Sequence, residues 1–64
     1  MNTLVRTFEL EPHMVIKVGP GWFESEVIGG EEVEFEYTIL SILAVEVGQY
    51  TTNVTVECIR YVGL

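Results

Sequence analysis

The sequence contains no aspartate, and cysteine and histidine occur once each, as Cys58 and His13. A single thiol excludes a disulfide within the chain, and these two residues cannot supply the four ligands of a structural zinc site. No motif brings a serine, cysteine or histidine together as a nucleophile and its base. We therefore expect no catalytic residues, no metal and no cofactor, and a protein that is not an enzyme.

Basic residues are also scarce. The chain contains three basic residues (Lys and Arg) and ten acidic residues, all of them Glu, which gives a formal net charge of −7. Nucleic acids and anionic membranes bind basic surfaces, so neither is expected as a direct partner, and no small molecule is implied. The longest apolar-rich run, residues 37–47, is shorter than the ~20 residues of a membrane-spanning helix, and no secretion signal is recognisable. A soluble, intracellular protein is predicted.

The chain is too short to bury all of its apolar side chains in a core of its own. Its 64 residues form one domain, residues 1–64, and 48% of them are hydrophobic. A domain of this size buries only roughly 60% of the surface that its unfolded chain exposes. The usual supplements are disulfides, metals or association, and only association remains here. We expect self-association or binding to a larger protein partner.

Alternating apolar and polar residues predict β-strands along most of the chain, with no helical periodicity of useful length. Proline and glycine mark the turns between the strands. The expected strands cover residues 3–10, 14–18, 22–28, 32–47 and 51–62. The predicted fold is all-β, with about five antiparallel strands in a meander that forms a small barrel or a two-layer sandwich. In the last strand, Val54, Val56 and Cys58 are expected to point into the core.

The stretch over residues 29–47 changes character along its length. Val33, Phe35 and Tyr37 alternate with glutamates at first, which predicts one buried face and one solvent face. From Ile39 onward both faces are apolar. A short helix over residues 39–47 has roughly the right spacing, but β-branched residues dominate and no cap precedes it. The second half is therefore expected either at the centre of the core or in contact with another chain.

The two glycines at residues 29 and 30 predict a hairpin whose register can be argued. A two-residue loop would oppose Val33 to Glu26 and mix apolar with charged groups on one face. A three-residue loop over residues 29–31 opposes Val33 to Val27 and gives one coherent apolar face. Because a slip of one residue turns every side chain to the other face, we predict the three-residue loop.

In this register four carboxylates form a row on the outer face, with Glu24 opposite Glu36 and Glu26 opposite Glu34. Like charges across a strand pair are destabilising, so the row is a candidate binding surface. It could bind a hard cation, receive a basic patch on a protein, or imitate the phosphates of a nucleic acid. The simplest alternative is a solvated face that keeps a β-protein soluble.

Aromatic residues supply the other candidate contacts. Trp22 and Tyr61, together with Tyr50, are candidates for a contact patch, because aromatic side chains are enriched in interface hot spots. Phe23 is expected in the core opposite Tyr37. His13 follows a proline and is expected in an exposed turn.

Two functions follow from these patterns. The first is a non-enzymatic protein–protein association module, acting as a small structural or accessory subunit of a larger homomeric assembly such as a viral particle. The alternative is an acidic inhibitor or nucleic-acid mimic, whose carboxylates, Glu34 and Glu36 among them, block a basic site on a partner.

Overall fold

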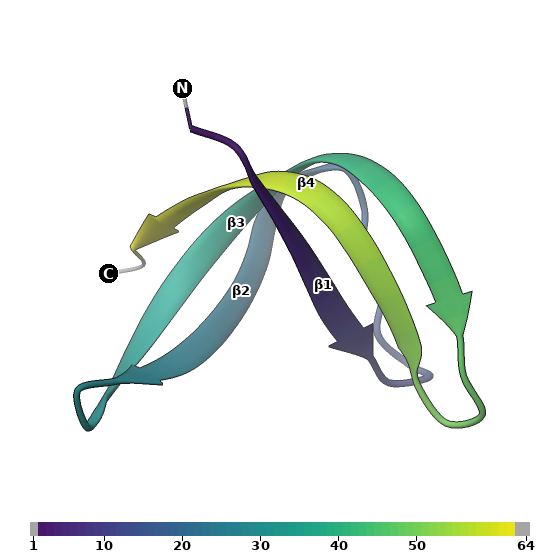
Figure 1. Ribbon diagram of the computed structural model, residues 1–64, viewed down its shortest axis with the longest axis horizontal. Helices are drawn as coiled ribbons and strands as arrows, with labels where there is room; N and C mark the ends of the chain where they lie inside the picture. The colour runs from purple at the N-terminus through teal and green to yellow at the C-terminus, as the bar shows by residue number, and fades with distance from the viewer. Residues whose placement is uncertain (1, 63–64) are drawn as a thin grey trace.

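One open antiparallel β-sheet makes up the protein (Figure 1). The computed structural model describes residues 2–62. Its strands are β1 (Leu4–Leu10), β2 (Gly19–Ile28), β3 (Glu31–Val47) and β4 (Thr52–Val62), in the order β1-β4-β3-β2. The all-β, antiparallel prediction is confirmed. The expected count of five strands is wrong for the described residues, which form four strands, and the sheet neither closes into a barrel nor pairs with a second layer.

The strand expected at residues 14–18 is instead an extended linker. A turn precedes it, in which the Met14 amide donates a hydrogen bond of 3.0 Å to the Glu11 carbonyl. Since β1 and β2 occupy opposite edges, this linker crosses the sheet, and Met14 and Ile16 pack against the core. Alternation over residues 14–18 predicts Met14, Ile16 and Val18 on one inward face. Met14 and Ile16 cover the face of the sheet, whereas Val18 is 59% exposed. β1 pairs with β4 and makes no hairpin with its neighbour in sequence.

Residues 19–21, Gly-Pro-Gly, were expected to interrupt the chain but begin β2. Proline lacks an amide donor and is tolerated in β2 because this is an edge strand. Gly19 and Gly21 have φ of 123° and 106°, and the register shifts between Pro20 and Trp22. With this irregular start, β2 extends far enough to place Gly19 opposite Ile39.

The β2–β3 turn contains two residues, so the predicted three-residue loop is wrong. Gly29 and Gly30 have φ of 59° and 82°, and Ile28 pairs with Glu31 across them. Two consecutive positive φ values are typical of a type I′ turn, whose twist matches that of the flanking strands. Glycine adopts this conformation without steric cost, and this turn geometry outweighs the matching of apolar cross-strand pairs.

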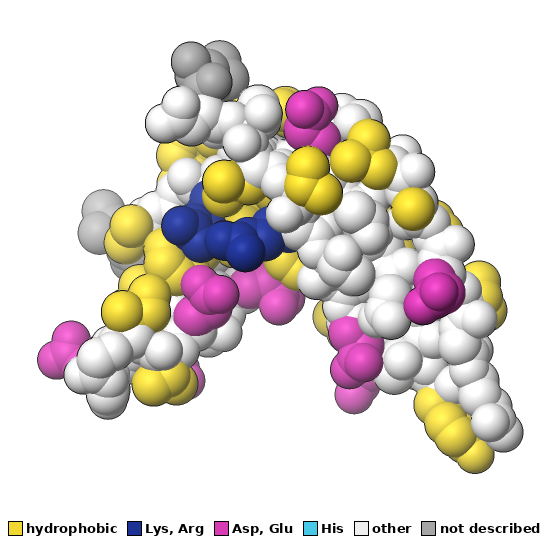
Figure 2. All heavy atoms as spheres, in the orientation of Figure 1, with side chains coloured by type: hydrophobic (Ala, Val, Ile, Leu, Met, Phe, Trp, Pro, Cys, Tyr) yellow, Lys and Arg dark blue, Asp and Glu magenta, His cyan; other side chains and the backbone are white. Residues whose placement is uncertain are grey.

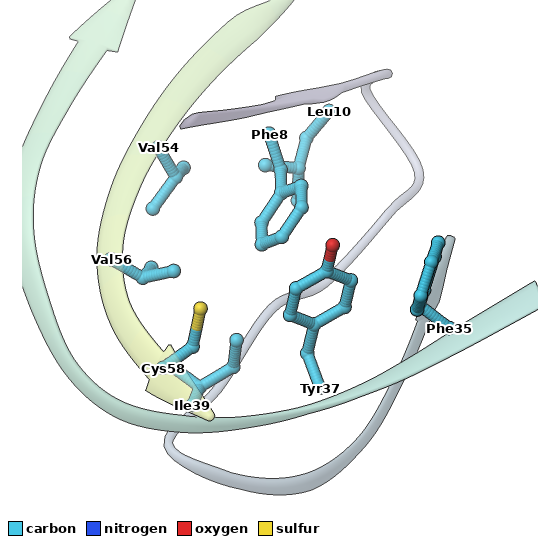
Figure 3. Close-up of a cluster of buried hydrophobic side chains, with 8 residues drawn as sticks. All are labelled: Phe8, Leu10, Phe35, Tyr37, Ile39, Val54, Val56 and Cys58. Carbon is cyan, nitrogen blue, oxygen red and sulfur yellow. The ribbon is translucent and has the colours of Figure 1, made fainter. Parts of the chain in front are cut away.

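The core lies on one face of the sheet, which we call the inner face; the opposite one is the outer face. Its buried side chains are Phe8, Leu10, Phe35, Tyr37, Ile39, Val54, Val56 and Cys58 (Figure 3). The inward orientation predicted for the β4 residues is confirmed. The Phe8 ring lies 5.1 Å from the Tyr37 ring and 5.8 Å from the Trp22 ring, measured between centroids. One side chain thus links the β1 edge to the β2 edge, and the sheet curls into an arch.

Two bulges bend β3 over the top of this arch (Figure 1). The register of β3 against β4 shifts between Ile39 and Ser41, and again between Ile42 and Ala44. Each bulge adds a residue to one strand and increases its local bend. Arg60 interrupts the alternation of β4, which predicts a bulge near residues 58–60 or burial of both faces against a partner. The observed shift lies in the facing strand, opposite Glu57 and Cys58. One leg of the arch ends at the β2–β3 turn, and the other at the β3–β4 turn.

Candidate functional site

The second half of β3, residues 40–47, is hydrogen-bonded to a neighbouring strand on one side only; we call it the β3 arm. Pairing with β2 stops at Ile39, whereas pairing with β4 continues to Val47. An edge of this kind presents backbone N–H and C=O groups that another strand can bind. At about 3.3 Å per residue, the arm offers roughly 26 Å of such edge.

Apolar side chains on the β3 arm are exposed. Ile39 is 1% exposed, but exposure rises to 57% at Val45 and 77% at Val47. Leu40, Ile42 and Leu43 are exposed as well, and Figure 2 shows yellow side chains along this leg of the arch. The expectation that residues 39–47 form the centre of the core is therefore wrong beyond Ile39. A single open sheet with a short β2 leaves the arm uncovered, and its contact with another chain remains a prediction.

The predicted row of four carboxylates does not form, because the two-residue turn shifts β2 by one position. Two of the glutamates lie on the inner face and two on the outer face. The observed pairs are Glu24 with Phe35, Glu26 with Val33, Ser25 with Glu34 and Phe23 with Glu36. No glutamate of β2 lies directly opposite a glutamate of β3. The like-charge repulsion that marked the row as a candidate site is therefore absent.

The inner-face glutamates have local structural partners. The Arg60 Nη1 lies 3.8 Å from the Glu26 Oε2, and its guanidinium sits 4.5 Å from the centroid of the Phe35 ring. Figure 2 shows basic side chains beside acidic ones near the top of the hollow between the legs. A partly exposed ion pair contributes about 1 kcal/mol at most. Arg60 interrupts the apolar alternation of β4 because it covers the Phe35 ring and faces Glu26.

Trp22 and Phe23 take the reverse of the expected positions. Trp22 lies opposite Tyr37 and packs against the core, while Phe23 is 52% exposed on the outer face. The Trp22 Nε1 is buried and makes no hydrogen bond of good geometry. Burial raises the pKa of the Glu24 carboxyl, the nearby Trp22 indole opposes the rise, and Glu26 adds to it. Glu24 therefore favours the fold most at acidic pH, and this contribution is lost as pH rises through its raised pKa.

The expected aromatic contact patch is divided between the two faces. Trp22 belongs to the inner face, whereas Tyr61 is 49% exposed on the outer face and Tyr50 lies in the β3–β4 turn. A different row is present on the outer face: Phe23 and Tyr61 both lie opposite Glu36, one on each neighbouring strand. The correct turn length would have predicted Phe23 opposite Glu36, whereas the position of Tyr61 depends on the separate register of β3 against β4.

Charge is separated between the faces of the sheet. Within the described strands the outer face carries no Lys or Arg, since Arg6 and Arg60 pair with inner-face residues and Lys17 lies in the linker. The strand glutamates on this face are Glu9, Glu32, Glu34, Glu36, Glu46 and Glu57. Only Glu46 belongs to the β3 arm. The arm therefore carries little of the charge of this strongly acidic surface.

Cys58 is fully buried, as predicted, and burial raises the pKa of its thiol above the ordinary 9.0, while Arg6 and Arg60 oppose the rise. We expect the native chain to react with a thiol reagent such as DTNB at least ~100-fold more slowly than the urea-unfolded chain, because reaction requires opening of the core. Folding stability should also fall as pH rises through the raised pKa, since the neutral thiol is the favoured form in the core. Equal modification rates in both states would contradict this assignment.

Two hollows lie on the surface of residues 2–62. One, of about 320 Å³, lies between the linker and the inner face, where Met14 and Ile16 approach Leu10 and Val54. The other, of about 470 Å³, lies beside Thr7 and Thr55, whose hydroxyl oxygens are hydrogen-bonded at 2.9 Å. Residues 2–62 contain no group of three or more His, Cys, Asp or Glu placed to hold a metal.

None of these described residues forms a helix long and apolar enough to cross a membrane. Comparison with protein-family models, with curated proteins and with solved structures finds no match to this chain.

Proposed function

We propose that the protein is a protein–protein association module, a structural or accessory subunit of a larger assembly, which binds its partner through the β3 arm. One observation carries this proposal: residues 40–47 form a strand that is paired on one side only and exposes apolar side chains. Addition of a strand to such an edge gives affinity through backbone hydrogen bonds and through side chains on both faces.

The β3 arm has fewer charged residues and prolines than the other sheet edges. Proteins protect free edges with charged residues, prolines, β-bulges or coverage by another segment. Bulges occur both in the arm and at the start of β2. The β2 edge contains Pro20, Glu24 and Glu26, and β1 contains Arg6 and Glu9. Residues 40–47 contain no proline or basic residue, and Glu46 is their one charged side chain. The arm is therefore the edge best suited to accept a partner strand.

The acidic-inhibitor alternative has lost its main support. It depended on Glu24, Glu26, Glu34 and Glu36 acting together, and the observed register divides these residues between two faces. No specific feature favours this function over association through the arm.

A test combines sedimentation velocity with binding of an apolar dye such as ANS to the purified chain. We expect either a species heavier than the 7.2 kDa monomer or a monomer that binds dye through its exposed arm. A stable monomer that binds no dye would contradict the proposed function, because the apolar arm would then be covered within the chain.

A further inference from the structure

We infer that the partner of the β3 arm is a second copy of this chain, paired arm to arm and antiparallel about a two-fold axis. The inference rests on the proposed function and names its partner. A two-fold interface uses the same surface on both copies and closes at the dimer. Pairing of the free edges would join the two sheets in the order β1-β4-β3-β3-β4-β1, and it would satisfy the unpaired backbone groups of both arms at once.

Charge favours the second copy over a basic partner. Each chain carries −7, yet residues 40–45 contain no charged side chain. A two-fold axis near Leu43 places Glu46 of one arm opposite residues 40–42 of the other, so no carboxylate meets a carboxylate. A basic protein would gain most on the outer face, where the strand glutamates gather, and little along the arm. The chemistry of the arm thus suits an uncharged apolar edge, and each copy supplies one.

Apolar side chains on both faces of the β3 arm support the same partner. Ile42 and Val45 lie opposite the buried Val56 and Val54 and therefore belong to the inner face, next to the core. Ala44 pairs with Thr55 on the outer face. A paired second arm would bring apolar neighbours to both faces. Stable interfaces bury about 800 Å² per partner, and an interface formed by one arm from each chain would be smaller. Dimer formation should therefore depend on concentration.

Sedimentation velocity on the full chain, at micromolar to millimolar concentration, tests the inference. We expect the mass to rise from 7.2 kDa to twice that value and to stop there. Sodium chloride should strengthen the dimer, because raising salt from 0.1 to 1 M shortens the Debye length from about 10 Å to about 3 Å and screens the repulsion between two acidic chains. Weakening by salt, or growth beyond the dimer, would overturn the inference.

Matched lysine variants locate the interface. Val45→Lys should lower the association constant at least tenfold, because pairing would bury an ammonium group against apolar side chains. Val5→Lys is the control: Val5 is 62% exposed and Val45 57%, but Val5 lies on β1. A second pair is Val47→Lys and Val27→Lys, at sites 77% and 75% exposed. Far-UV circular dichroism selects the variants that keep the fold. Equal loss in an arm variant and its control would overturn the inference.

The outcomes separate this inference from the proposed function. A wild-type chain that remains monomeric at every concentration and salt, yet binds ANS in a manner abolished by Val45→Lys, overturns the second copy and leaves the arm as a binding surface for another protein. A monomer that binds no dye overturns both.

Discussion

Phe8→Ala is expected to lower the free energy of unfolding by about 3 to 5 kcal/mol, the usual cost of removing a buried aromatic ring. Phe8 is 6% exposed and contacts Tyr37 and Trp22 with its ring, which connects the two edges of the sheet. The total free energy of unfolding of a 64-residue domain is roughly 3 to 10 kcal/mol. The substitution should therefore unfold a large part of the population at 25 °C, as measured by urea denaturation followed by Trp22 fluorescence.

Phe23→Ala is the matched control for this substitution. Phe23 is 52% exposed and lies opposite Glu36 on the outer face, whereas the buried cluster lies on the inner face. Its replacement should cost about 1 kcal/mol or less, as is usual for surface positions. Equal losses at Phe8 and Phe23 would show that the ring contacts across the inner face do not hold the arch together.

Ile39→Ala should cost about 2 to 5 kcal/mol, whereas Ile42→Ala should cost well under half as much. Both side chains belong to the inner face of β3, but Ile39 is 1% exposed and Ile42 is 43% exposed. The difference arises because the core ends at Ile39, and the first bulge carries the following residues out of it. Denaturation of both variants at low protein concentration, which disfavours association, measures the difference.

At high protein concentration the result for Ile42→Ala should change. If the arm is an interface, the variant should also reduce association, and its apparent stability should fall further below that of the wild type as concentration rises. Ile39→Ala should show the same deficit at every concentration at which it folds. A deficit for Ile42→Ala that is independent of concentration would argue against contact through the arm.

The period-two alternation of the chain was sufficient to predict the all-β class and most strand boundaries. It placed Val54, Val56 and Cys58 in the core. These predictions succeed because the face to which a strand residue points depends only on its position within the strand. The same local information could not show that Met14 and Ile16 belong to a linker that covers the sheet.

Register depended on a competition that the sequence does not resolve. Gly29 and Gly30 favour a two-residue turn, whereas the matching of apolar pairs across the strands favours a three-residue loop. The structure contains the two-residue turn. This single step moved Glu24 and Glu26 to the inner face, exposed Phe23 and removed the predicted carboxylate row. A candidate site that depends on cross-strand neighbours can be no more reliable than the register that defines them.

What the sequence determined by itself was the strand class, the inward series of β4 and of the first half of β3, and the presence of an unusually apolar stretch after Ile39. Only the tertiary structure decided that this stretch is an arm outside the core. The physical reason is that alternation reports the face of a residue, whereas burial requires another segment over that face. Here β2 begins opposite Ile39, and within residues 2–62 no second layer covers residues 40–47, so the most apolar part of β3 remains on the surface.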